Sequence, residues 1–153
     1  MEFYKISAMV KVPEADIEAV VPADGSAQKR FMKAARGKGK YYRVASNHSS
    51  VITLIFTDRG DLYGAPYLPQ TYAKRLTPGT CLLRTDCGGY IVAEKAVQVV
   101  SSPNASFKRK FKECKDNDMY LCLSGKKQTC TYLAMESGML YGCHGVRESS
   151  FGH

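Results

Sequence analysis

The sequence VVPADGSAQKRFMKAARGKGKYYRVASNHSSVITLIF (residues 20–56) shares one pattern with VVSSPNASFKRKFKECKDNDMYLCLSGKKQTCTYLAM (residues 99–135). At an offset of 79 positions the double valines, the Lys-Arg pairs and the tyrosines Tyr41 and Tyr120 coincide. Similarity in a constant order along a chain is typical of an internal repeat. We therefore predict that the chain is a tandem duplication.

The similarity extends beyond these stretches and indicates where one repeat ends. With a gap of one residue in the alignment, Leu62-Tyr63-Gly64 aligns with Leu140-Tyr141-Gly142. Between the matching segments lies Thr77-Pro78-Gly79, a tripeptide typical of a turn. The predicted domains are therefore residues 1–76 and residues 77–153.

Each predicted repeat contains one main amphipathic helix. In the first repeat Ser26 is the predicted N-cap of a helix that continues to about Arg36. In the second repeat Asn104 is the predicted N-cap of the matching helix. Apolar side chains spaced as on one helical face support both helices: Ala27, Phe31 and Ala34, and Phe107, Phe111 and Cys114.

Strand patterns rich in Val, Ile, Leu and Tyr surround both helices. A strand ending in the double valine is expected before each helix, and three strands are expected after it, at residues 41–45, 51–56 and 61–65, and at residues 120–124, 129–135 and 139–143. A short helix over residues 69–76 is predicted to close the first repeat, and the polar tail 147–153 is predicted to be loose. The predicted fold is α+β, with two tandem β-β-α-β-β-β repeats in small mixed or antiparallel sheets.

Composition places the chain among ordinary globular proteins with an excess of positive charge. It has 153 residues, of which 44% are hydrophobic and 24% charged, and its net charge is +8. It lacks an apolar run of the roughly 18 residues that a membrane span needs, and its first residues do not form a signal peptide. We therefore expect a cytoplasmic protein with no membrane partner, which binds a polyanion such as nucleic acid or a phosphorylated ligand.

The cysteine and histidine patterns favour neither a metal site nor catalysis. All six cysteines lie between Cys81 and Cys143, and none forms the Cys-x-x-Cys pair of a zinc knuckle. Without a signal peptide they are expected to be reduced. Cys143 and His144 are neighbours in a predicted strand and would point to opposite faces, and His48 has no placed carboxylate partner. We expect no enzyme activity, no metal and no cofactor.

Both predicted helices carry a stripe of basic residues at helical spacing. Like charges on one helical face repel each other, at a cost that an anionic partner would offset. The alternative is a solvated face opposite the core. The stripes and the basic residues beside them are Lys29, Arg30, Lys33 and Arg36, and Lys108, Arg109, Lys112 and Lys115.

Two short turns combine glycine with lysine: Gly37-Lys38-Gly39-Lys40 and Gly125-Lys126-Lys127. Backbone N–H groups in such turns can hold a phosphate, although most turns of this composition have no ligand. Neither turn matches the Gly-x-x-x-x-Gly-Lys-Ser/Thr pattern of a nucleotide-binding P-loop.

Five short motifs follow one another in the second repeat: Gly88-Gly89, Val99-Val100, Ser102-Pro103-Asn104-Ala105, Lys108-Arg109 and Gly125-Lys126-Lys127-Gln128-Thr129. They resemble the glycine turn, double-aliphatic strand, helix start, Lys-Arg pair and Gly-Arg-Arg-Thr-like turn of one known family, the RemA-like bacterial extracellular-matrix regulatory proteins. In the first repeat the helix from Lys29 to Arg36 and the ending LPQTYAKRL (residues 68–76) are similar to the same family. The two matches cover most of the chain.

The resemblance implies a LytTR-like DNA binder that assembles into rings, curves double-stranded DNA around its outside and regulates transcription. It would then be a homo-oligomer associated with the nucleoid. The family's DNA contacts map onto Lys95, Lys126 and Lys127. The equivalent places in the first repeat hold Asp16, Asn47 and His48, so the second repeat is expected to make most of the contacts.

Lysine at these positions favours contact with phosphates over the bidentate reading of guanine that arginine allows. The leading hypothesis is therefore a DNA-binding transcriptional regulator or architectural protein. One alternative is a non-enzymatic protein that binds or sequesters a nucleotide or another phosphorylated small molecule, and another is a structural assembly protein whose charge is incidental. The charge and the Gly-Lys turns fit both of the binding functions.

Overall fold

The structure is a computed structural model that describes residues 2–46 and 48–152, so the expectation for Asn47 lies outside the described residues. The elements up to Ala73 are β1 (Phe3–Lys5), β2 (Lys11–Pro13), the single-turn 3-10 helix η1 (Glu14–Asp16), β3 (Ile17–Pro22), α1 (Ser26–Gly37), β4 (Tyr41–Arg43), β5 (Thr53–Thr57), β6 (Leu62–Ala65) and α2 (Pro69–Ala73). No helix in the described ranges is long and apolar enough to cross a membrane.

The elements after Leu76 follow nearly the same order. They are β7 (Leu82–Thr85), β8 (Tyr90–Val92), the 3-10 helix η2 (Ala93–Lys95), β9 (Ala96–Val100), α3 (Ala105–Asp116), β10 (Tyr120–Cys122), β11 (Thr131–Met135), β12 (Leu140–Cys143) and β13 (Val146–Ser149). The predicted α+β class is confirmed, with mixed and antiparallel sheets.

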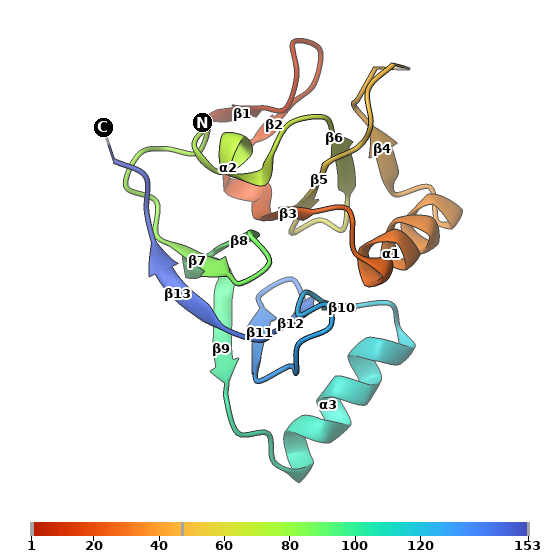
Figure 1. Cartoon of the computed structure of the whole chain (residues 1–153), viewed down its shortest axis with the longest axis vertical. Helices are drawn as coiled ribbons and strands as arrows, with labels where there is room; N and C mark the ends of the chain where they lie inside the picture. Colours follow the sequence, from red (N-terminus) through yellow and green to blue (C-terminus); the bar gives the residue numbers. More distant parts are fainter. Residues whose placement is uncertain (1, 47, 153) are drawn as a thin grey trace.

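The strands form two main sheets and one separate hairpin (Figure 1). The larger sheet has the order β13-β7-β8-β3-β5-β6-β4, and the smaller has the order β10-β12-β11-β9. In each sheet one edge pair is parallel, β4 with β6 and β10 with β12, and the other pairs are antiparallel. The larger sheet therefore takes strands from both sides of the predicted boundary at residue 76, and the division into two domains stays a prediction.

The pairing of the strands shows where the first of the two similar segments is one residue longer than the second. Phe56 pairs with Leu62 in the first hairpin, and Ala134 pairs with Leu140 in the second. These strands match at an offset of 78, whereas α1 and α3 match at 79. The one-residue gap in the alignment of the two repeats therefore falls between β4 and β5, and not after Leu54. The duplication itself stays a prediction that superposing the two segments would test.

The largest apolar cluster lies between the two sheets. It joins Ala19, Val21 and Leu54 of the larger sheet to Leu121 and Leu133 of the smaller one. On its opposite face the larger sheet packs against the β1–β2 hairpin and α2, through residues such as Tyr4 and Tyr72. A third, small cluster lies under α3. Helix α1 contacts β10 across the boundary between the sheets.

The two main helices begin differently. Gly25, and not Ser26, is the N-cap of α1, and no side chain of the described residues caps this end. The prediction for Ser26 was wrong because glycine adopts the extended N-cap conformation as well, and serine follows as the first helical residue. Asn104 is confirmed as the N-cap of α3, where its Oδ1 accepts a hydrogen bond from the Phe107 N–H at 2.9 Å.

The described part of the tail is ordered against the larger sheet, which corrects the prediction of a loose segment. Strand β13 pairs with β7, with Arg147 opposite Arg84 and Ser149 opposite Leu82. Phe151 then packs against Tyr90, with ring centroids 5.5 Å apart. The tail forms a strand because its backbone pairs with β7, which is far away in the sequence. The polar sequence of the tail by itself does not indicate this pairing.

Candidate functional site

Lys95, the first residue expected to contact DNA, lies inside the protein. It ends η2, its side chain is nearly buried, and its Nζ is 2.5 Å from Asp58 Oδ2 in the β5–β6 turn. Its charge is therefore neutralised by the other half of the chain, and it does not face solvent in this structure.

Lys126 and Lys127 are exposed and lie beside the N-terminus of α1. Together with Gly25, Ser26 and Arg30 they line one hollow between the first helix and the turn that follows β10. The fold therefore brings a cation of the first predicted repeat together with two of the second. A helix N-terminus presents free backbone N–H groups and the positive end of the helix dipole, so the hollow is suited to an anion.

The charges around this hollow are not all free. Lys127 Nζ lies 3.7 Å from Asp86 Oδ2, and Asp24 also lines the hollow. Within residues 2–46 and 48–152, no carboxylate lies within ion-pair distance of Arg30 or Lys126. These two side chains are the cations most available to a bound anion.

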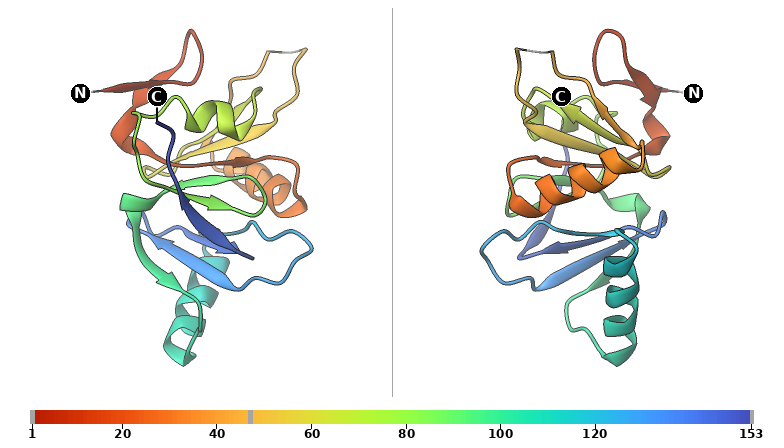
Figure 2. Two further views of the ribbon diagram at one scale, coloured as in Figure 1. Left: turned by 60° about the vertical axis from the view of Figure 1, so that its left-hand side comes forward. Right: turned by 90° about the vertical axis from the view of Figure 1, so that its right-hand side faces the viewer.

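The remaining predicted basic residues are exposed on the two helices, which lie on the side facing the viewer in the right-hand panel of Figure 2. Arg36 stacks its guanidinium over the Tyr41 ring at 5.2 Å. The other exposed cations are Lys29 and Lys33 on α1, and Lys108, Arg109, Lys112 and Lys115 on α3.

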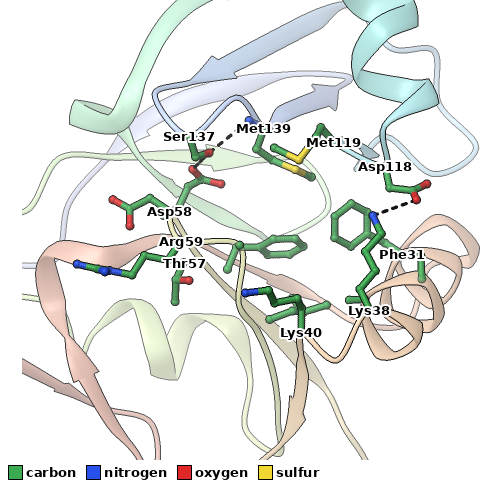
Figure 3. Close-up of a pocket in the computed structure, with 16 residues that line it drawn as sticks. Phe31, Lys38, Lys40, Thr57, Asp58, Arg59, Asp118, Met119, Ser137 and Met139 are labelled. Carbon is green, nitrogen blue, oxygen red and sulfur yellow. Dashed lines mark hydrogen bonds and ion pairs between the residues drawn. The ribbon is translucent and has the colours of Figure 1, made fainter.

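A second site, not foreseen from the sequence, is an apolar cavity of about 360 Å³ between the two halves (Figure 3). Its apolar lining comes from both sides of the boundary and includes Phe31, Phe56, Leu62, Met119 and Met139. The phenylalanine rings pack with centroids 5.4 Å apart. The cavity therefore offers an aromatic and thioether surface of the size that a small ligand fills.

A buried carboxylate, Glu18, also lines the cavity. Ser137 Oγ donates to Glu18 Oε1 at 2.5 Å and Tyr141 OH donates to Glu18 Oε2 at 2.7 Å, so both oxygens are satisfied across the interface. Burial raises the pKa of Glu18, and the two hydrogen bonds partly oppose this rise. The only sequence signal was an acid inside the otherwise apolar strand Ile17-Glu18-Ala19-Val20-Val21.

Cations surround the cavity, each paired with a carboxylate. Lys38 Nζ lies 3.1 Å from Asp118 Oδ2 and Lys40 Nζ lies 3.9 Å from Asp61 Oδ1, and both lysines are half exposed. Both belong to the first Gly-Lys turn, which leads from α1 into β4. An anionic group of a bound ligand would have to compete with Asp61 and Asp118 for these two lysines.

The structure brings one thiol close to an imidazole, and the sequence did not suggest this pair. Cys130 Sγ lies 3.9 Å from His144 Nδ1, but that nitrogen is already 2.8 Å from the carbonyl oxygen of Gln128. Burial raises the pKa of the neighbouring Cys143 to about 12, which disfavours a thiolate. The described residues contain no group of three or more side chains arranged to hold a metal ion, and the six cysteines are free thiols.

Comparison with protein-family models and with curated proteins gave no match. The resemblance to RemA-like proteins therefore remains a prediction that depends on the motifs quoted above.

Proposed function

We propose that this protein binds double-stranded DNA, with the hollow between α1 and the Gly125–Lys127 turn as its main phosphate contact. The observation that supports the proposal most strongly is the grouping of Arg30 with Lys126 and Lys127 from the other half of the chain. Phosphate contacts of this kind position a protein on DNA without reading its sequence. A role in transcription or DNA architecture rests on the RemA-like resemblance.

Binding through phosphates makes a quantitative prediction. Each neutralised phosphate releases condensed counterions, so the slope of log affinity against log salt changes by about 0.9 for each contact. We expect Arg30→Ala and Lys126→Ala each to weaken binding to unrelated duplexes about equally and to flatten this slope. Lys127→Ala should have a smaller effect, because Lys127 is already paired with Asp86.

The test is a gel-shift series at several salt concentrations on defined duplexes. Lys74→Ala is the charge-matched control, since Lys74 is exposed at the end of α2 and does not line the hollow. The Arg30→Ala, Lys126→Ala double variant should lose most of the salt dependence attributed to the hollow. Unchanged affinity and slope in that variant would overturn this interface and direct attention to the stripe Lys108, Lys112 and Lys115 on α3.

A second candidate function is binding of a phosphorylated small molecule in the cavity between the halves. The observation that favours it is the position of Lys38 and Lys40 beside an apolar, aromatic interior. A nucleotide combines a flat aromatic base, whose faces can pack against apolar side chains, with phosphates, and it matches this arrangement. Titration of ATP followed by calorimetry should show binding that weakens in Lys38→Ala and is unaffected by Lys126→Ala. The opposite dependence would assign any bound ATP to the hollow instead.

A further inference from the structure

The chain contains two hairpins at matching positions of the two halves, and the two hairpins differ in the strands that pair with them. The β1–β2 hairpin pairs Phe3 with Pro13, and the β7–β8 hairpin pairs Leu82 with Val92, which is the same register displaced by 79 residues. The second hairpin also pairs through its other edge, because β8 lies beside β3. Among the described residues β2 pairs with β1 alone, so the matching edge of β2 is free.

Strands β3 and β9 show the complementary difference. Strand β3 pairs with β5 on one side and β8 on the other, whereas β9, in the described ranges, pairs with β11 alone. Val20 of β3 is only 1% exposed, and Val99 at the matching position of β9 is 53% exposed. Val97, two residues earlier, is 60% exposed. The edge that β3 gives to a hairpin is thus open in β9 and carries two exposed valines.

The two free edges cannot meet within one molecule. In Figure 1 the β1–β2 hairpin lies at the top of the molecule, and β9 lies in its lower half, at the edge of the smaller sheet. An open, apolar edge strand is a ready template for pairing with another chain. Each molecule therefore presents one half of a contact at one end and the other half at the opposite end.

We propose that a second copy of this chain places its β1–β2 hairpin against β9, and so repeats between molecules the pairing that β8 makes with β3 within one molecule. In the chain Ala19 pairs with Ile91 and Val20 pairs with Tyr90. Displacement by 79 residues gives the contacts between copies: Gln98 of one molecule opposite Val12 of the next, and Val99 opposite Lys11.

This contact is heterologous, because the surface on one molecule differs from the surface on its neighbour. Every added copy leaves one free hairpin and one free β9, so the assembly closes into a ring or continues as a filament. The proposal is independent of the DNA-binding function, since none of Arg30, Lys126 and Lys127 belongs to either edge strand.

The first test measures the mass of the full chain in solution by light scattering at tens of micromolar. The wild type should give a multiple of 16.9 kDa. Val99→Asp places a charge on the proposed contact and should reduce the mass to that of one chain. Leu68→Asp is the matched control, because Leu68 is also exposed (62%) but lies at the start of α2. A monomeric wild type, or Val99→Asp with the mass of the wild type, would overturn the proposal.

A second test keeps the proposal falsifiable if Val99→Asp fails to fold. Lys11→Cys and Val99→Cys are prepared separately, mixed and treated with a short bifunctional maleimide. Directly opposed residues of paired strands have Cβ atoms about 5 Å apart. The mixture should therefore give cross-linked dimers well above the level seen with either variant alone, and each variant alone also measures the background of the native thiols. Equal cross-linking in the mixture and in Lys11→Cys alone would contradict a heterologous contact.

Discussion

Helices α1 and α3 have the same length and similar basic stripes, yet their surroundings differ. Ala27, Phe31 and Met32 of α1 pack against the cluster between the two sheets. Helix α3 packs Phe107 and Phe111 against a small cluster of its own half. The difference shows that the same local pattern can lie at an internal interface in one half of a chain and at an outer surface in the other.

The matching β strands next to these helices show the same contrast. Leu121 of β10 is buried in the cluster between the two sheets, whereas Tyr42, at the matching position of β4, is 44% exposed. Substitutions at matched positions of the two halves test this contrast.

The largest effect is expected for Leu121→Ala. Removal of a fully buried leucine side chain leaves a cavity and should lower the free energy of unfolding by about 2–5 kcal/mol. Tyr42→Ala is the matched variant and should cost less than about 1 kcal/mol, since Tyr42 contacts mainly Tyr63 at the surface. Urea unfolding of both variants checks the prediction. Equal losses of the free energy of unfolding would show that the two side chains are buried to a similar extent.

Two ion pairs of the β5–β6 turn provide the next comparison. Asp58→Ala leaves the nearly buried Lys95 without its partner and should cost about 3 kcal/mol. Arg59→Ala removes a neighbouring pair with Asp16 in which the arginine is largely exposed, and it should cost less than about 0.5 kcal/mol. Thermal unfolding at low and high salt distinguishes them, because salt should weaken only the exposed pair.

The helix N-termini predict a smaller difference. Asn104→Ala removes a capping hydrogen bond and should destabilise the protein by about 1 kcal/mol. Ser26→Ala should change the free energy of unfolding by less than about 0.5 kcal/mol, because Ser26 makes no capping bond. A larger loss for Ser26→Ala than for Asn104→Ala would reverse the assignment of the caps.

The smallest effect is a change in pH dependence at Glu18. The pKa of Glu18 is raised above 4.5 by burial, so the folded state holds this proton to higher pH than the unfolded state does. Its contribution to stability is complete below that ordinary value and is lost as pH rises through the folded-state pKa. Glu18→Gln should therefore gain stability relative to the wild type as pH rises from 4 to 7, as followed by urea midpoints. A constant difference would mean that Glu18 is ionised at the same pH in both states.

Elements that depend on local pattern were predicted well. Asn104 begins α3 as expected, and the strands after each helix lie within the predicted ranges or one residue beyond them. The prediction of a loose tail was wrong because β13 pairs with β7, a strand more than 60 residues earlier. The exposed basic residues were identified from helical spacing, but the burial of Lys95 depends on Asp58, which no short-range pattern connects to it.

The amino-acid sequence was enough to identify the two main helices and the strands beside them, because apolar periodicity and turn glycines act over a few residues. Tertiary structure alone decided which sheet each strand joins, which helix lies between the halves, and that Arg30 meets Lys126 and Lys127 in one hollow. It also decided that β3 pairs on both edges, whereas within residues 2–46 and 48–152 β9 pairs on one edge alone. The physical reason is that strand pairing and burial depend on surfaces brought together from distant parts of the chain, and matching sequences receive different partners when one chain supplies only one internal interface.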